Sequence, residues 1–159
     1  MSGTRFDPIN LRILEELQCH ARITNQELAE RVALSPSACL ARVRKLEADG
    51  IIQRYLADLA LDKVDRIIEA FIEVTLENHS SSETVRFLKA VEEHPHIVSC
   101  HRMGGHYDFL LHVVVQDMPH LRQVADELLS GDLGVSKIAT IPILDRVKPF
   151  SGYPLRKLF

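Results

Sequence analysis

The sequence predicts an α+β protein with two parts, a winged helix-turn-helix unit joined by a strand linker to a ferredoxin-like βαββαβ sandwich. Two observations carry this prediction. In the first third of the chain, hydrophobic residues recur at helical spacing between strong cap signals. Beyond residue 66 the hydrophobic period switches to two, and strand-like and helix-like segments alternate. The 159 residues suffice for two small domains.

The most regular pattern runs from Thr24 to Gly50 and predicts two short helices around a fixed turn. Thr24 and Glu27 have the spacing of a capping box, which satisfies backbone amides at a helix start. Ser35 suits an N-cap, and the proline after it fits the first position of the second helix. That helix is expected to bury one apolar stripe, made of Leu40, Val43 and Leu46.

The outward face of this second helix combines small and basic side chains. Small and hydroxyl residues lie near its start, three cations follow, and no acid occurs between Ser35 and Leu46. Such a helix can meet base edges with its first turns while its cations hold phosphates. The residues expected to contact double-stranded DNA are Ser35, Ser37, Ala38, Ala41, Arg42, Arg44 and Lys45. Spacing alone leaves open an ordinary helical hairpin with a solvated basic face.

The flanking residues complete a compact unit. Asp7 and Pro8 predict the start of a third helix that covers the pair, and the apolar residues after Gly50 predict a strand. We therefore expect a DNA-binding domain over residues 1–60, a hinge over 61–66 and a second domain over 67–159. Residues 1–60 hold eight cations and eight acids, whereas residues 61–145 hold seven and fourteen. DNA contact should therefore be confined to one helix face.

The second half alternates strands and helices in the order βαββαβ, which is typical of a ferredoxin-like sandwich. Alternate residues from Ile68 to Leu76 predict a half-buried strand. Ser80 should cap the following helix, whose expected buried side is Val85, Leu88 and Val91. Further strands are expected over residues 97–103, 107–116 and 135–147. Pro142 fits an edge strand, and the sheet face without helices is expected to pack against a second subunit.

Composition excludes several classes of protein. No apolar run approaches the ~20 residues that a membrane-spanning helix needs, so we expect no membrane contact. The three cysteines form neither a disulfide framework nor a metal motif, which favours the reducing cytoplasm. We find no nucleophile elbow, phosphate-binding loop or zinc-protease motif, so we expect no catalytic residues, no enzymatic activity and no cofactor.

Taken in order, the motifs resemble the leucine-responsive regulatory protein/AsnC family of transcription regulators. The resemblance covers about residues 6–155. It rests on the opening helix with Asp7, on the helix-turn-helix up to Ser35 and Pro36, on residues 42–52, on the turn from Gly105 to Leu111 and on the late Pro154 and Leu155. Asn10 stands where the family usually has a second aspartate.

The resemblance implies a DNA-binding dimer, or an octamer built from dimers, that senses a small amino acid between its C-terminal domains. The implied effector-binding residues are Gly104, Gly105, His106, Tyr107, Asp108 and Thr140. Two glycines allow close backbone approach to a ligand, and Asp108 can hold an ammonium group by a charge-assisted hydrogen bond. The alternative is a plain hairpin turn in which Asp108 pairs with a surface cation. His106 is not the usual residue of the family in this turn, so the identity of the effector cannot be inferred from relatives.

The histidines suggest a different function. Five of the eight lie between His94 and His112, close to Cys100, so a metal-responsive winged-helix repressor is the alternative prediction. Their spacing matches no recognised ligand pattern, and His101 and His106 flank a glycine turn. We therefore expect no metal site.

Overall fold

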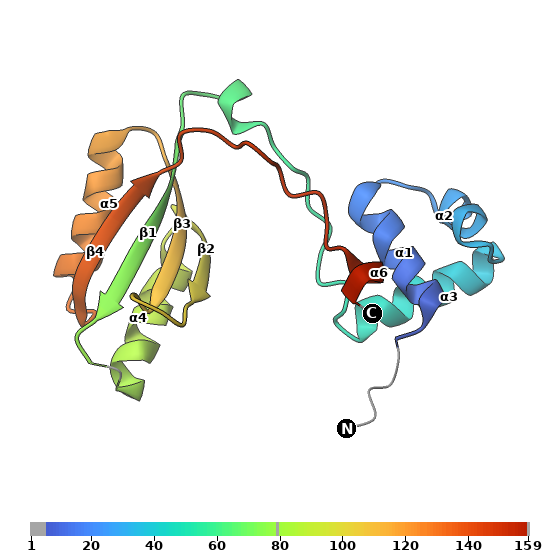
Figure 1. Cartoon of the computed structure of the whole chain (residues 1–159), viewed down its shortest axis with the longest axis horizontal. Coiled ribbons are helices and arrows are strands. Elements are labelled where there is room, and N and C mark those ends of the chain that lie inside the picture. Colours follow the sequence, from blue (N-terminus) through green and yellow to red (C-terminus); the bar gives the residue numbers. More distant parts are fainter. Residues whose placement is uncertain (1–5, 79, 159) are drawn as a thin grey trace. The chain divides into compact units, whose positions relative to one another are not determined.

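The computed structural model describes residues 6–78 and 80–158. The chain forms two compact units, one that combines residues up to Asp58 with the segment from Lys148 onward, and one that spans Leu59–Val147. Two segments of chain therefore connect the units (Figure 1). The predicted boundary placed all of residues 67–159 in the second domain, but the carboxyl-terminal segment packs in the first unit. No helix of the described residues is long and apolar enough to cross a bilayer.

The first unit contains α1 (Pro8–Cys19), α2 (Asn25–Val32), α3 (Pro36–Ala48) and the short α6 (Leu155–Leu158). Its buried core consists of Ile13, Leu28, Ala29, Val32, Cys39 and Leu46. The predicted stripe on α3 was wrong at Leu40, which is 38% exposed, while Cys39 is fully buried. Residues 39, 43 and 46 satisfy helical spacing as well as residues 40, 43 and 46 do, so spacing alone does not decide which residue is buried.

The segment after α3 forms no strand, so the predicted strand linker is wrong. The amides of Ile51 and Ile52 both donate to the Leu46 carbonyl, at 2.9 and 3.1 Å, and so end the helix. Tyr55 Oη then donates to Glu47 Oε1 at 3.0 Å. A strand needs a neighbour to complete its backbone ladder, and the described part of the first unit has no other strand.

The second unit begins with a short 3-10 turn (Leu61–Lys63) and continues as a βαββαβ sandwich. Its elements are β1 (Ile68–Leu76), α4 (Ser81–Glu93), β2 (Ile97–Arg102), β3 (Phe109–Val115), α5 (Met118–Ser130) and β4 (Val135–Pro142). The antiparallel sheet has the order β2-β3-β1-β4. This confirms the ferredoxin-like prediction, with β4 at an edge and Pro142 as its last residue.

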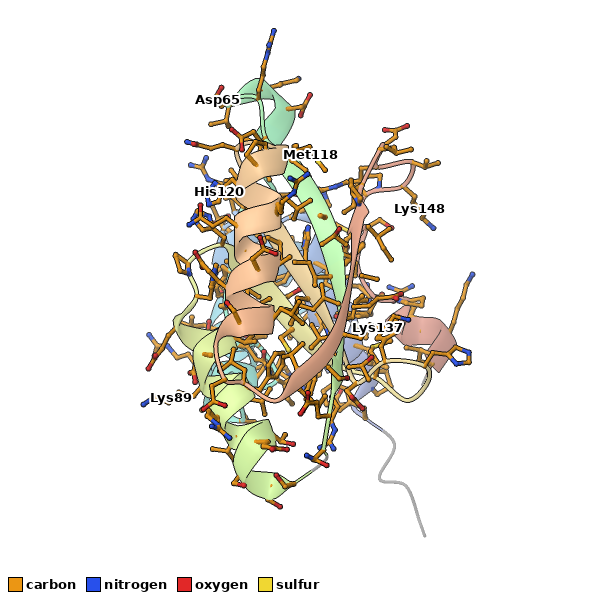
Figure 2. The ribbon with its side chains drawn as sticks, turned by 90° about the vertical axis from the view of Figure 1, so that its left-hand side faces the viewer. Asp65, Lys89, Met118, His120, Lys137 and Lys148 are labelled. Carbon is orange, nitrogen blue, oxygen red and sulfur yellow. The ribbon has the colours of Figure 1, made fainter. Side chains whose placement is uncertain are left out.

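Both helices of the second unit pack on one face of the sheet, over a single hydrophobic core (Figure 1). Figure 2 looks onto α5, with Met118 and His120 in its first turn. The predicted buried side of α4 was partly wrong, because Phe87 and Val91 are buried whereas Val85 and Leu88 are 65% and 41% exposed. Residues 87 and 91 are one helical turn apart, and the large Phe87 ring contacts Phe109 at a centroid distance of 4.9 Å.

The opposite face of the sheet, which we call the open face, carries no helix of the described chain. Cross-strand partners share a face in an antiparallel sheet, so the register places these residues there: Glu69, Phe71, Glu73, Leu110, His112, Val114, Ala139 and Ile141. Glu69 accepts from His112 Nε2 at 3.0 Å and from Arg146 Nη2 at 3.0 and 3.2 Å. The open face thus combines apolar residues with one charged network.

Candidate functional site

Side-chain caps fix the starts of both α2 and α3. The Glu27 amide donates to Thr24 Oγ1 at 3.2 Å and the Thr24 amide donates to Glu27 Oε2 at 3.0 Å, so the predicted capping box is confirmed. The Ala38 amide donates to Ser35 Oγ at 3.3 Å, and Pro36 begins α3. Ser35 and Pro36 set the direction in which α3 leaves the turn that follows α2.

A side-chain amide also ties α2 to α3. Asn25 Nδ2 donates to the Pro36 carbonyl at 2.9 Å, so the first turn of α3 is anchored to the first turn of α2. Sequence reasoning did not find this role of Asn25, because a polar residue in the first turn of a helix is common and its partner lies eleven positions away.

Most of the predicted DNA-contacting residues lie on the exposed side of α3. Ser35, Ser37, Ala41, Arg44 and Lys45 are exposed, and Ala38 is half-buried. Lys45 Nζ lies 3.1 Å from Asp49 Oδ2, whereas Arg44 has no ion-pair partner within the described residues. This side of α3 is therefore open to a ligand, and among its cations Arg44 is the one most available to bind a phosphate.

Arg42 differs from the other predicted DNA-contacting residues, because its guanidinium is held within the unit. Arg42 Nη1 donates to Asp7 Oδ2 at 2.6 Å and to Asn10 Oδ1 at 2.9 Å. The second oxygen of Asp7 accepts from the Ile9 amide at 2.7 Å and so caps α1. The hydrogen bond from Arg42, followed by that from Ile9, lowers the pKa of Asp7. We call Asp7, Asn10 and Arg42 the α1–α3 clamp.

The clamp gives Asn10 a second function. In the sequence Asn10 is notable only because the family usually has an aspartate there, but in the structure its side-chain oxygen accepts a hydrogen bond from Arg42. The clamp could not be seen in the sequence because Arg42 lies more than thirty positions after Asp7 and Asn10. From the clamp we propose that Arg42 positions α3, and the DNA contact predicted from the sequence is the alternative that the salt dependence of an Arg42 variant tests.

Charge supports a nucleic-acid interface on the first unit. With its carboxyl-terminal segment included, this unit holds eleven cations and eight acids, whereas the second holds eight cations and fourteen acids. Their formal net charges are therefore +3 and −6. A phosphate backbone is attracted to the first unit and repelled by the second.

The predicted effector turn connects β2 to β3 in the second unit. Gly104, Gly105 and His106 are exposed, while Tyr107 and Asp108 are half-buried. A Cβ added at either glycine would meet no described atom within 4 Å. Neither glycine is therefore required by packing within this chain, and the backbone of the turn is open to close approach by a ligand.

Asp108 has a structural function that the sequence did not reveal. Its Oδ2 accepts from the Leu76 amide at 2.8 Å. Its own amide donates to the Val74 carbonyl, and its carbonyl accepts from the Met103 amide, both at 2.8 Å. The register of β1 against β4 shifts between Thr75 and Leu76. Asp108 thus satisfies a backbone amide at an irregular point of β1.

The structure does not bring Thr140 together with the turn. Thr140 is exposed on β4 and pairs with Ile72, whereas the turn enters β3 on the other side of β1. Two strand spacings, ~10 Å, separate β4 from β3. A site that uses both Thr140 and the turn of one chain would have to reach across β1.

Three of the histidines gather in the second unit. His94, His96 and His120 are neighbours, with ring centroids 5.9 and 4.2 Å apart, and His94 Nε2 lies 3.3 Å from Glu127 Oε2. Within the described residues, however, no group of three or more His, Cys, Asp or Glu could hold a metal ion.

The fold and these sites define a class of protein, a helix-turn-helix DNA-binding protein with a separate ligand-binding domain. Two family models match the chain, winged helix-turn-helix DNA-binding over residues 6–53 and the Lrp/AsnC ligand binding domain over residues 69–153. The chain belongs to the Lrp/AsnC family of transcription regulators. This confirms the predicted family and function and argues against the metal-responsive alternative.

Relatives of this family match nearly the whole chain. The chain is 39% identical over 146 residues to the leucine-responsive regulatory proteins of Klebsiella pneumoniae and of Escherichia coli K12, covering 92% of this chain and 89% of each relative. A transcriptional regulator from Neisseria meningitidis, solved in complex with L-Met, is similar in structure with a TM-score of 0.86 and 34% identity. That similarity covers 96% of this chain and 99% of the other.

An AsnC family regulator from Agrobacterium tumefaciens has a TM-score of 0.85 and 29% identity over the same shares.

Proposed function

We propose that this protein regulates transcription by binding double-stranded DNA through α3 and that a small amino acid modulates this binding. The observation that carries the DNA-binding part is the exposed, acid-free side of α3, held in place by the caps and the α1–α3 clamp. Phosphates would be contacted mainly by Arg44 and Lys45, and base edges would be approached by Ser37, Ala38 and Ala41.

A binding assay over a range of salt concentrations tests this proposal. A duplex selected from a random pool by the wild-type protein serves as the operator. Each neutralised phosphate contributes about 0.9 to the slope of log affinity against log salt concentration, so Arg44→Ala should lower the slope by about that amount. Arg22→Ala, which removes an exposed cation outside α3, is the control. Equal slopes for wild type and Arg44→Ala would remove Arg44 from the interface.

We propose that the effector is an amino acid and that the turn from Gly104 to Asp108 binds it. The L-Met complex of the Neisseria regulator supports an amino-acid ligand, and the open backbone of the turn supports its place. The ammonium group would meet Asp108, while the carboxylate would meet backbone amides of the turn. A thermal-shift screen of the twenty amino acids tests the first step, since a ligand at ~100 times its dissociation constant adds about 2.7 kcal/mol of stability.

Two variants of Asp108 separate ligand binding from structure. Asp108→Asn keeps an oxygen that can accept from the Leu76 amide but loses the charge that attracts an ammonium group. Asp108→Ala loses both and should also destabilise the second unit, since it leaves a backbone amide without its acceptor. We expect Asp108→Asn to fold as wild type and to lose the thermal shift. If it responds at wild-type concentrations, Asp108 does not hold the ammonium group.

We also propose that the open face binds a second copy of the chain. Its apolar residues lack a covering helix, and a second chain could bring a β4 strand near the effector turn, which Thr140 of the same chain does not approach. Ile141→Glu, which places a charge on this face, should reduce the mass measured by light scattering. An unchanged mass would exclude this face as the interface. We propose no particular subunit number beyond a dimer, and an octamer remains a prediction.

The proposed place of action is the cytoplasm, where bacterial chromosomal DNA is found. A DNA-binding regulator has its target there, and the few, widely separated cysteines suit a reducing compartment. Fractionation of expressing cells, with the protein followed by antibody, tests this directly. Recovery with the envelope fraction would contradict it.

A further inference from the structure

The carboxyl-terminal segment, residues 148–158, is attached to α1 by specific contacts. The Tyr153 amide donates to Gln18 Oε1 at 2.7 Å, and Gln18 Nε2 donates to the Tyr153 carbonyl at 3.4 Å. The side-chain amide of Gln18 therefore pairs with both backbone groups of one residue. One turn away, Arg156 forms an ion pair with Glu15. We call these contacts the tail anchor.

A glycine makes this attachment possible. Gly152 has a φ of +94°, a conformation that other residues adopt rarely. A Cβ added there would lie 3.3 Å from three atoms of the Gln18 side chain. The backbone thus approaches Gln18 more closely than an alanine would allow without a shift.

Apolar contacts support the anchor. The rings of Phe150 and Tyr153 meet edge to face at 5.0 Å. With Leu14, Leu17 and Ile52 they line an open groove of about 750 Å³ within the first unit. The half-buried Leu155 lies in the same groove. The segment is therefore an integral part of the first unit and not a loose end.

This attachment changes how the two units are connected. With only residues 53–60 between them, the DNA-binding unit could reorient about one segment without secondary structure. Because the chain returns from the end of β4 and is fixed on α1, a second covalent segment restrains the unit. A restrained unit has less conformational freedom to lose when it binds DNA.

We propose that residues 148–158 form a strap that couples the effector unit to the DNA-binding unit. The proposal rests on the function proposed above, because it assigns a regulatory role to the connection between the two sites. The strap holds α1, and α1 holds α3 through Arg42. Ligand binding in the second unit changes operator affinity through this chain of contacts only while the strap is attached.

Substitutions in the tail anchor test the proposal in the full-length protein. Gly152→Ala crowds Gln18, and Arg156→Glu turns an ion pair into a repulsion. The exchanged pair Glu15→Arg with Arg156→Glu restores the attraction and the net charge. Lys157→Glu is the matched control, since it makes the same change of charge beside Arg156 at an exposed residue with no ion pair in the described part of the chain. Chymotrypsin cleavage after Phe150, which is followed by Ser151, reports whether the strap is attached.

Operator affinity is measured with and without L-leucine and L-methionine, at a temperature where every variant is folded. We expect Gly152→Ala and Arg156→Glu to be cleaved faster than the wild type. Both variants should also lose most of the change in operator affinity that the amino acid causes. Such changes are typically about 5- to 150-fold in allosteric proteins. The exchanged pair should restore both properties. Lys157→Glu should weaken DNA binding through charge alone and keep the response.

Three results would overturn the strap. The first is unchanged cleavage in Gly152→Ala and Arg156→Glu, which would show that the tail anchor does not hold the segment. The second is faster cleavage with a wild-type amino-acid response. The third is an equal loss of response in Lys157→Glu. A wild-type protein without any response would instead contradict the function proposed above, and the thermal shift of each variant, measured without DNA, separates the two failures.

Discussion

Arg42 and Arg44 lie two positions apart on α3, and the structure predicts that their removal weakens DNA binding in different ways. Arg42 donates two hydrogen bonds to Asp7 and Asn10, and its side chain is 33% exposed. Arg44 is exposed, with no ion-pair partner within the described residues. We therefore expect Arg42→Ala to act through the position of α3 and Arg44→Ala to act through a lost phosphate contact.

The magnitudes follow from the number of phosphates that each arginine neutralises. For one phosphate, log affinity against log salt concentration changes in slope by about 0.9. Over a fourfold increase in salt, the wild type should thus lose about 3.5-fold more affinity than Arg44→Ala. Arg42→Ala should bind more weakly at every salt concentration but keep the wild-type slope. It should also lower the melting temperature, which Arg44→Ala should not.

Fluorescence anisotropy with a labelled duplex, together with thermal unfolding, measures both quantities. Asp7→Asn provides a matched test of the clamp, because asparagine still caps a helix well but carries no charge. Its effect and that of Arg42→Ala should be non-additive in the double variant, as expected for residues in contact. If the slope of Arg42→Ala falls by about 0.9, Arg42 contacts a phosphate and the clamp does not account for its role.

Three further predictions concern stability and reactivity. Phe87→Ala empties a fully buried position against Phe109 and should destabilise the second unit by about 3–5 kcal/mol. Val85→Ala, at an exposed position of the same helix, should change the unfolding free energy by less than about 0.5 kcal/mol. Equal effects of the two variants in denaturant titration would show that α4 buries a different face. Ellman's reagent should modify the exposed Cys19 first and Cys39 only on unfolding, since burial shields Cys39 and raises the pKa of its thiol; a single fast phase would contradict this. The pKa of Asp7 is lowered from its ordinary value of 3.8, so the ionised form of Asp7 stabilises the fold above pH 3.8, and this stabilisation disappears as pH falls through the lower folded-state pKa. The difference in unfolding free energy between wild type and Asp7→Asn should therefore shrink over that pH range. A constant difference would exclude this link between ionisation and stability.

Local signals in the sequence were sufficient for the elements that depend on near neighbours. The capping box at Thr24 and the Ser35–Pro36 start involve residues within three positions of each other, and the structure has both. The alternation along β1 and the edge position of Pro142 followed from side-chain period and backbone chemistry alone. These features are local, so periodicity and caps determine them.

Features that depend on contacts between distant parts of the chain could not be predicted from the sequence. Hydrophobic spacing alone could not choose between Cys39 and Leu40, because a rotation of one residue keeps a good apolar stripe. Nor could composition show that Tyr153 would pair with Gln18, 135 positions earlier. The structural role of Asp108 was hidden in the same way, since its acceptor function depends on the end of β1, 32 positions away.

Control of DNA binding by the effector turn is tested most directly by the affinity of the full-length protein for its selected duplex, measured with and without the amino acid that gives the largest thermal shift. We predict binding that weakens steeply with salt and an affinity that changes at least about fivefold when the amino acid is added. The same titration with Asp108→Asn should show the DNA binding without the change. Equal affinity in the presence and absence of an amino acid that stabilises the protein would contradict the central claim that the effector turn controls α3.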